Sequence, residues 1–137
     1  MDDCVFCKII AGEIPSYKLY EDEHTLAFLD VHPVNPGHTL VIPKEHHRNI
    51  FDIPEEALAR VTVVAQKVSL AIQESIGAEG VTLRMNNEPA GGQDVFHAHL
   101  HVIPRHKRDD LSGWPQHEYA DDAAMKEIGE KLRTKLG

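Results

Sequence analysis

Cysteine, long apolar runs and basic residues are all scarce in this 137-residue chain. Its two cysteines, Cys4 and Cys7, are too few and too close together for the disulfide framework of a small secreted protein. No apolar run approaches the ~18 residues of a membrane-spanning helix, and the start Met1-Asp2-Asp3-Cys4 lacks the basic residues of a signal peptide. We therefore expect a cytoplasmic protein with no membrane contact.

The shortage of basic residues also bears on the partners of the chain. There are 14 Lys and Arg against 22 Asp and Glu, which gives a formal net charge of −8 with neutral histidines. This balance argues against nucleic acid as a partner, because phosphate neutralisation needs clustered Lys and Arg. With 42% hydrophobic and 26% charged residues, the composition is that of a globular protein. No linker divides the chain, so we expect one domain over 1–137, with its motifs in about 4–105 and a polar tail at 106–137.

Hydrophobic periodicity predicts strands at 17–21, 25–30, 38–42, 80–86 and 96–103 and a short apolar turn of helix or strand at 5–10. A long helix is expected between the third and fourth strands, with Asp52 as its cap and an early Pro54. Its apolar residues step by three and four and predict one buried stripe: Leu58, Val61, Ala65, Val68, Ile72 and Ile76. A shorter helix is predicted at 121–136. Because a strict βαβα alternation is absent, the order fits an antiparallel α+β fold.

Histidine is the residue in excess, with 10 in the chain, and three of them alternate at His97, His99 and His101. Side chains along a strand point to opposite faces, so these three should line one face about 6–7 Å apart, while Phe96, Ala98, Leu100 and Val102 enter the core. Three interpretations are open. The histidines could lie on an ordinary solvent-facing strand, they could bind a metal, or they could act on phosphorus.

Phosphorus chemistry suits a neutral imidazole, which can attack an anionic phosphate without the repulsion that a carboxylate would meet. Neighbouring histidines can neutralise developing charge and protonate a leaving group. The loop before the histidines agrees with this interpretation. Its Gly91-Gly92 pair lets backbone N–H groups approach a ligand closely, and Asn87 and Gln93 offer neutral donors to phosphoryl oxygens.

The chain resembles the histidine triad (HIT) family, whose motif alternates three histidines with hydrophobic residues and ends in two more. Residues 97–103 match that motif fully. The resemblance covers about Cys4 to Arg105, and it is most marked for bacterial-type members that bind purine nucleotides and hydrolyse nucleoside phosphoramidates. Further landmarks occur in the family's order: Phe6-Cys7-Lys8-Ile9-Ile10, Glu13-Ile14-Pro15, Glu21-Asp22, Ala27-Phe28-Leu29-Asp30, Gly37-His38-Thr39-Leu40-Val41-Ile42-Pro43-Lys44 and Gly91-Gly92-Gln93. The resemblance implies a HIT-like five-stranded antiparallel sheet with one long helix and a shorter C-terminal helix.

Roles for the histidines follow from the resemblance. It implies that His99 is the nucleophile and forms a nucleotidyl-histidine intermediate at the α-phosphorus. It implies that His101 contacts the phosphoryl oxygens and assists the leaving group, that His38 lines the same site, and that the carbonyl of His97 holds the His99 ring. No metal takes part in this chemical step.

The resemblance also assigns nucleotide-binding residues. It implies that Asp30 binds both ribose hydroxyls, because one carboxylate can accept two hydrogen bonds. It places the base in a slot whose members could equally be ordinary core residues: Phe6, Ile9, Phe28 and Val31. Asp94 departs from the family pattern, because Ser or Thr is common at this position. An ionised aspartate cannot donate and repels an anionic substrate, so it faces solvent, stays protonated or pairs with a cationic amine leaving group.

Cys4 and Cys7 have a counterpart in family members that hold zinc. The resemblance implies a Cys₂His₂ set of Cys4, Cys7, His46 and His97, which would be closed and structural. A redox pair is the alternative, although nothing around the two cysteines is typical of a thioredoxin-like unit.

The resemblance therefore implies a hydrolase of purine nucleoside monophosphate derivatives, adenosine 5′-phosphoramidates above all, that works as a homodimer with sheets joined across the interface. Two rival functions are a dinucleoside polyphosphate hydrolase or nucleotidyl transferase of the same fold, and a nucleotide-binding regulatory protein. Trp114 lies in the tail at a distance where related proteins place aromatic residues near the active site or a partner, and simple docking of the tail is the alternative.

Overall fold

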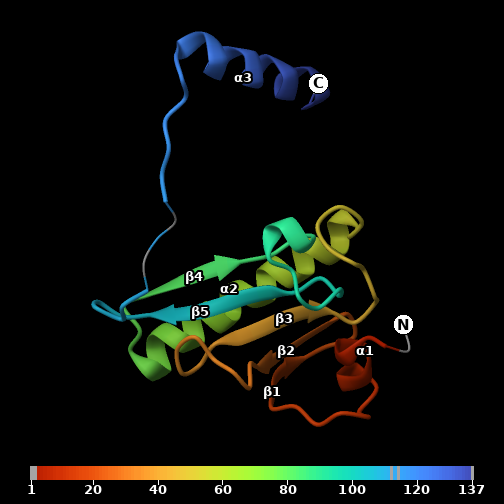
Figure 1. The fold of residues 1–137 in the computed structure, drawn as a ribbon. Coiled ribbons are helices and arrows are strands. Elements are labelled where there is room, and N and C mark those ends of the chain that lie inside the picture. Colours follow the sequence, from red (N-terminus) through yellow and green to blue (C-terminus); the bar gives the residue numbers. More distant parts are fainter. Residues whose placement is uncertain (1–2, 112, 114, 137) are drawn as a thin grey trace.

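The computed structural model describes residues 3–111, 113 and 115–136, and Trp114 lies outside them. Its centre is one five-stranded sheet in the order β1-β2-β3-β5-β4, in which all neighbouring strands are antiparallel (Figure 1). The elements are α1 (Val5–Ile10), β1 (Lys18–Glu21), β2 (Thr25–Leu29), β3 (Thr39–Pro43), α2 (Glu55–Ile76), β4 (Gly80–Arg84), the 3₁₀ turn η1 (Pro89–Gly91), β5 (Leu100–Arg105) and α3 (Asp122–Leu136). The predicted α+β class, the single long helix and the shorter C-terminal helix are confirmed.

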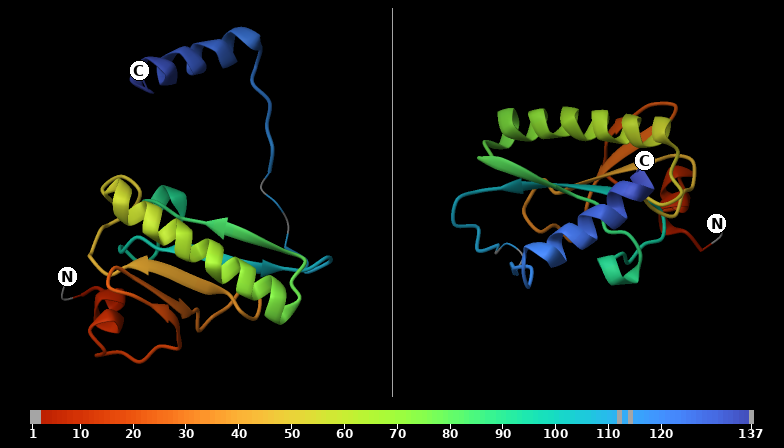
Figure 2. Two further views of the ribbon diagram at one scale, coloured as in Figure 1. Left: turned by 180° about the vertical axis from the view of Figure 1, so that it is seen from behind. Right: turned by 90° about the horizontal axis from the view of Figure 1, so that it is seen from above.

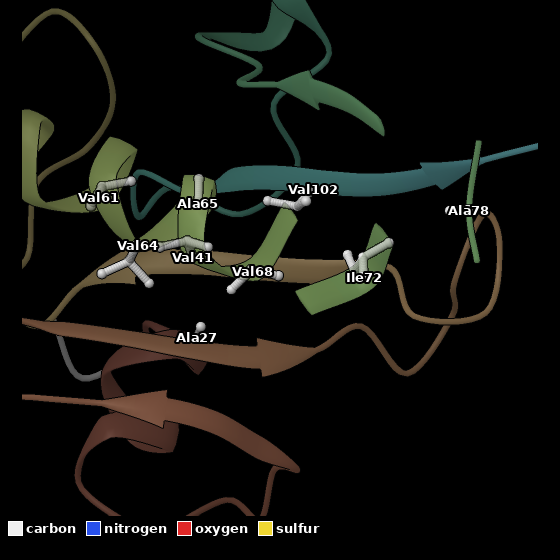
Figure 3. Close-up of a cluster of buried hydrophobic side chains, with 9 residues drawn as sticks. All are labelled: Ala27, Val41, Val61, Val64, Ala65, Val68, Ile72, Ala78 and Val102. Atoms are coloured by element: carbon white, nitrogen blue, oxygen red, sulfur yellow. The ribbon is translucent and has the colours of Figure 1, made fainter. Parts of the chain in front are cut away.

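Each face of the sheet is covered by a different helix, because successive strand residues point to opposite sides. Ala27 of β2 and Val41 of β3 point toward α2 and form one core with it (Figure 3). Phe28 and Leu40, their neighbours in sequence, pack with α1 in a second core on the opposite face. Both faces of β3 are buried, which explains why its apolar residues Leu40, Val41 and Ile42 follow one another without alternation.

The predicted stripe of α2 is confirmed in its middle and changed at its ends. Val61, Ala65, Val68 and Ile72 are buried, as is Val64, but Leu58 is only partly buried and Ile76 is 47% exposed. A stripe of period three and four drifts around a straight helix, so both ends leave the sheet.

The predicted Asp52 cap of α2 is wrong. Pro54 is the residue before the first turn, and no side chain caps this helix. The Asp52 carboxylate instead accepts hydrogen bonds from the backbone N–H groups of Arg48 (3.0 Å) and Asn49 (2.9 Å). An aspartate carboxylate readily accepts hydrogen bonds from backbone N–H groups a few residues away, and here these bonds take the place of a cap on the helix.

The predicted strand at 96–103 begins later than expected, because regular pairing starts only at Leu100. Ala98 and Val102 are buried as predicted, but Phe96 is 37% exposed beneath the guanidinium of Arg48, and Leu100 is only partly buried. His97 and His99 are buried in the irregular segment that precedes the strand. The three histidines therefore do not form one open face.

The tail carries α3 away from the sheet, past the outer strand β4 (Figures 1 and 2). No residue of α3 is buried, and its apolar side chains Met125, Ile128 and Leu132 are about half exposed. Within the residues that the structure describes, no helix combines the length and the apolar character needed to cross a membrane.

Candidate active site and metal site

Two elements bring three histidines together on the α1 side of the sheet. His101 lies on β5 opposite Leu40 of β3, and His38 immediately precedes β3. The His38 Nε2 and His101 Nδ1 atoms are 2.8 Å apart, and the His99 and His101 rings are in edge contact at 5.0 Å. His38, His99 and His101 thus form one cluster, and the side chain of His97 belongs to another.

Backbone groups determine which nitrogen of each ring carries the proton. The backbone N–H of Val34 donates to His38 Nδ1 at 3.0 Å, so the His38 proton lies on Nε2 and is donated to His101 Nδ1. The proton of a neutral His101 is then on its Nε2. His99 Nδ1 lies 2.7 Å from the carbonyl oxygen of His97 and donates to it, which leaves the His99 Nε2 lone pair unprotonated.

Burial keeps His38 and His101 uncharged near neutral pH. It lowers the pKa of His101 to about 4, an effect that the neighbouring His99 and His38 reinforce. Burial also lowers the pKa of His38, although the nearby Asp30 carboxylate opposes the change. The site therefore offers a ligand neutral N–H donors beside the Nε2 lone pair of His99.

His99 and His101 line a cavity of about 280 Å³. Its other walls are mainly apolar, and Phe6 lies edge-on to the His99 ring at 5.1 Å. Asp30 is at the rim, half-buried, with Oδ1 accepting from the His32 N–H at 2.9 Å. The members of the predicted base slot all line this cavity, but they differ in burial: Phe6, Ile9 and Phe28 are buried, and Val31 is 80% exposed.

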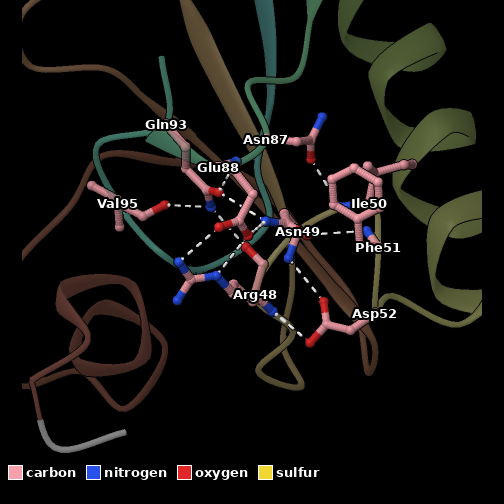
Figure 4. Close-up of polar contacts among 9 residues, drawn as sticks. All are labelled: Arg48, Asn49, Ile50, Phe51, Asp52, Asn87, Glu88, Gln93 and Val95. Atoms are coloured by element: carbon pink, nitrogen blue, oxygen red, sulfur yellow. Dashed lines mark hydrogen bonds and ion pairs between the residues drawn. The ribbon is translucent and has the colours of Figure 1, made fainter. Parts of the chain in front are cut away.

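The predicted phosphate donors of the loop are used inside the protein (Figure 4). Both N–H groups of Gln93 are donated to carbonyls, to Arg48 at 2.7 Å and to Val95 at 3.0 Å. The Asn87 amide accepts from the Ile50 N–H and donates to the Met85 carbonyl. Gly92 has a φ of +85°, which a side chain would strain. These contacts hold the loop in shape, and they use both N–H groups of the Gln93 amide but only one of the two on Asn87.

Three residues that the sequence interpretation missed complete this network. Arg48 donates to the Glu88 carboxylate through Nε (2.7 Å) and Nη2 (3.0 Å), and the buried Asn49 donates to Glu88 and to Gln93 (3.0 Å). Glu88 has φ +64° and ψ +162°, a region that non-glycine residues rarely occupy. No local pattern links positions 48 and 88, so the sequence carries no signal for this contact.

A second cluster combines the two cysteines with two histidines. Cys4 Sγ is 3.4 Å from His97 Nδ1, and Cys7 Sγ is 3.3 Å from His46 Nδ1. One donor atom from each of these four residues lies within 4.8 Å of the others. His97 Nε2 donates to the Pro43 carbonyl at 2.8 Å, so its Nδ1 lone pair faces the sulfurs.

The donor set of this second cluster fits zinc. Two thiols and two imidazoles converge from different elements, which is the composition of a closed tetrahedral site. Without a cation, burial and the neighbouring Cys4 raise the pKa of the Cys7 thiol to about 11, and burial lowers the pKa of His97 to about 4. A divalent ion would offset the cost of holding two thiolates side by side.

Asp30, His38 and His101 form a further group of possible ligands. Its acidic member, Asp30, immediately follows β2. Both nitrogens of His38 are already used, however, because Nδ1 accepts from Val34 and Nε2 donates to His101. This group is therefore a hydrogen-bonded chain, whereas the cysteine cluster has inward-facing lone pairs.

The family model described as HIT domain matches residues 11–108. "Protein hit" of Bacillus subtilis is 46% identical over 121 residues, which are 88% of this chain and 83% of that protein. "Adenylylsulfatase HINT3" of Arabidopsis thaliana is 44% identical over 110 residues, 80% of this chain and 56% of that protein. The chain therefore belongs to the HIT domain family, a family of nucleotide-binding proteins.

Solved structures agree with this assignment. The crystal structure of SMU.412c from Streptococcus mutans matches with a TM-score of 0.93 and 43% identity, covering all of this chain and 87% of that chain. A zinc-bound histidine triad family protein from Mycobacterium smegmatis matches with a TM-score of 0.78 and 38% identity over 95% of this chain and 98% of that chain. The fold is thus the HIT fold, α3 included.

Proposed function

We propose that the chain hydrolyses purine nucleoside phosphoramidates or related nucleoside monophosphate derivatives through a nucleotidyl intermediate on His99. The observation that carries the proposal is the 2.7 Å hydrogen bond from His99 Nδ1 to the His97 carbonyl. It leaves a neutral Nε2 lone pair on a buried ring that lines the cavity. A second neutral imidazole, His101, lies in edge contact beside it.

The reaction has two steps. His99 Nε2 attacks the α-phosphorus, the P–N bond breaks with its electron pair on nitrogen, and the nitrogen takes a proton from solvent water and leaves as the amine. Water then attacks the phosphorus of the nucleotidyl-histidine, the bond to Nε2 breaks, and a nucleoside monophosphate is released. The Nε2–H group of His101 donates a hydrogen bond to a phosphoryl oxygen. The proton stays on His101 Nε2 because His38 donates its own hydrogen bond to His101 Nδ1.

The cavity next to His99 supplies the nucleotide site in this proposal. Phe6, Ile9 and Phe28 give the base an apolar slot, and Val31 covers it from the exposed rim. Asp30 at the rim accepts a hydrogen bond from each of the two ribose hydroxyls. Zinc in the cysteine cluster would hold α1 against the sheet, and the chemical step needs no metal because His99, His101 and His38 carry it.

A second candidate reaction is supported by the Arabidopsis relative, whose name describes an adenylylsulfatase. The same His99 attack with sulfate as the leaving group would hydrolyse an adenylyl sulfate. Three further functions compete with the proposed one: dinucleoside polyphosphate hydrolysis, nucleotidyl transfer, and nucleotide binding without turnover. They differ in the leaving group or in the absence of turnover.

A substrate panel separates these functions. Initial rates should be measured with adenosine 5′-phosphoramidate, adenylyl sulfate, diadenosine polyphosphates and a nucleotidyl sugar, with wild-type protein and with His99→Asn. We expect the phosphoramidate to be the best substrate and the variant to lose activity by several orders of magnitude while it still binds AMP. A variant that keeps more than a few per cent of the rate would remove His99 as the nucleophile.

We further propose that two copies join along β4. This strand is an outer strand of the sheet, and its side chains Val81 (36%) and Leu83 (46%) are exposed. Leu83→Lys should convert a dimer to a monomer in light scattering. Leu19→Lys is the matched control, because Leu19 is equally exposed (46%) on the opposite outer strand β1. A monomeric wild-type protein would disprove the dimer.

A further inference from the structure

Arg84 lies beside His101, which lines the nucleotide cavity next to His99. It is directly opposite His101 in the antiparallel pair of β4 and β5, so the two side chains project from the same face of the sheet. Neighbouring strands are about 4.8 Å apart, a distance that an arginine side chain can span. Four side chains thus follow one another across this face, on or next to β2, β3, β5 and β4: Asp30, His38, His101 and Arg84.

The guanidinium of Arg84 is turned toward the loop that follows β4. Its Nε donates to the Asn86 amide oxygen at 2.9 Å, and the Asn86 amide nitrogen donates to the Gly92 carbonyl at 3.3 Å. Among the described residues, neither Nη group has a hydrogen bond or an ion pair. Arg84 also contributes to the low pKa of His101, after burial and the two other histidines, which have larger effects. Two guanidinium nitrogens near His101 are therefore available to a ligand.

The other groups around the candidate active site provide no positive charge for a phosphate. Burial keeps His38 and His101 neutral near pH 7. Asp30 and Asp94 also line the nucleotide cavity, and a carboxyl group does not attract an anion. The backbone N–H groups of residues 91–93 all donate to carbonyls within their own loop. A phosphate group beside His101 therefore finds no cation among these groups.

We propose that Arg84 is a further phosphate-binding residue and that its guanidinium donates to a non-bridging oxygen on the α-phosphorus. This inference rests on the proposed function and adds a residue to its site. His101 donates to the phosphoryl group from β5 and Arg84 from the adjacent β4, and the planar fork of a guanidinium matches the spacing of phosphate oxygens. Its charge is in place before the reaction, beside the oxygens that carry negative charge in the transition state.

The binding of AMP and of adenosine tests the inference, because the two ligands differ only in the 5′-phosphate. We expect Arg84→Gln to weaken AMP binding by about threefold to fivefold, as for an ion pair open to solvent, and to leave adenosine binding unchanged. Arg84→Lys keeps the charge and should lose less affinity than Arg84→Gln. Arg60→Gln is the matched control, because Arg60 is an exposed arginine on α2, which covers the opposite face of the sheet. Titration calorimetry measures both ligands with each protein.

Substrates in which sulfur replaces one non-bridging oxygen test the position of the contact. The two diastereomers of such a phosphoramidate present sulfur to different sides of the site, so Arg84→Gln should change the ratio of their rates and Arg60→Gln should not. Three results would overturn the inference and leave the hydrolase function standing: an unchanged AMP affinity in Arg84→Gln, an equal weakening of AMP and adenosine, or an unchanged rate ratio. AMP binding that depends on Arg84, in a protein that cleaves no substrate of the panel, would overturn the proposed function alone.

Discussion

Asp30 is a half-buried carboxylate at the rim of the nucleotide cavity, with Oδ2 3.7 Å from His38 Nε2. We predict that Asp30→Ala raises KM about tenfold or more, because it removes hydrogen bonds between a charged group and the ribose. The variant should also lose any preference for a ribose over a 2′,3′-dideoxyribose substrate, whereas the wild type should show one. Steady-state kinetics on both sugars measures this. A variant that still prefers ribose would assign sugar recognition to other residues.

The backbone at Glu88 stores strain that the Arg48–Asn49–Gln93 network holds in place. Glu88→Ala and Glu88→Gly both remove the carboxylate, but only glycine occupies this φ and ψ without strain. We predict that both variants are less stable than the wild type and that Glu88→Gly is the more stable of the two by about 1 kcal/mol. Urea unfolding midpoints decide the comparison. Equal midpoints would mean that the backbone at position 88 is unstrained.

At the scale of elements, α1 is six residues long, and together with its N-cap Cys4 it carries two groups of side chains with different partners. Cys4 and Cys7 contact the histidines of the second cluster, while Phe6 and Ile9 line the nucleotide cavity. So short a helix is not stable alone, and its position depends on these contacts. Zinc would therefore act on nucleotide affinity through the placement of α1.

We predict about one zinc per chain in purified protein and its loss in the double variant Cys4→Ser/Cys7→Ser. The melting temperature should fall by several degrees or more, and KM should rise much more than kcat falls. His99→Asn is the matched control, because it should keep the metal. Metal content by mass spectrometry, thermal melts and kinetics give the three readouts. Loss of kcat in a zinc-free protein that is still folded would place the metal in the chemical step.

The elements differ in how far the sequence predicts them. The course of α2 follows from its 3.6-residue period, and the β3 strand from its apolar run between Gly37 and Lys44. The late start of β5 could not be predicted, because Phe96 follows the period of a strand and yet pairs with Arg48, 48 positions earlier. Local alternation does not report such a contact. The sequence could not predict the grouping of the histidines for the same reason. The motif places His97 near His99 in the chain, but only the fold brings the His97 side chain to Cys4.

For the whole molecule, histidines that the fold keeps neutral make the free energy of unfolding depend on pH. The pKa of His101 is about 4 in the folded protein and about 6.5 when the chain is unfolded, so the unfolded chain binds more protons between these values. Stability is then fully present above pH 6.5 and is lost as the pH falls toward 4, by at most about 1.4 kcal/mol per pH unit for each such histidine.

We predict that His101→Gln flattens this decline, since glutamine takes up no proton. Urea midpoints at pH 7, 6 and 5 measure the slope for both proteins. His24→Gln is the control, because His24 is exposed beside Glu23 and should leave the slope unchanged. Equal slopes in wild type and His101→Gln would show that other groups cause the acid sensitivity.

His97 divides its atoms between two sites: its ring faces the cysteines, and its carbonyl oxygen accepts from His99. Every amino acid has that carbonyl, so side-chain substitution cannot delete the contact that orients His99. A mutational scan scored by activity would register His97 only through the metal cluster, and would misjudge what the position does for catalysis. Replacing the amide linkage between residues 97 and 98 by an ester weakens the His97 carbonyl as an acceptor, although it also removes the Ala98 N–H that donates to the His47 carbonyl at 2.7 Å.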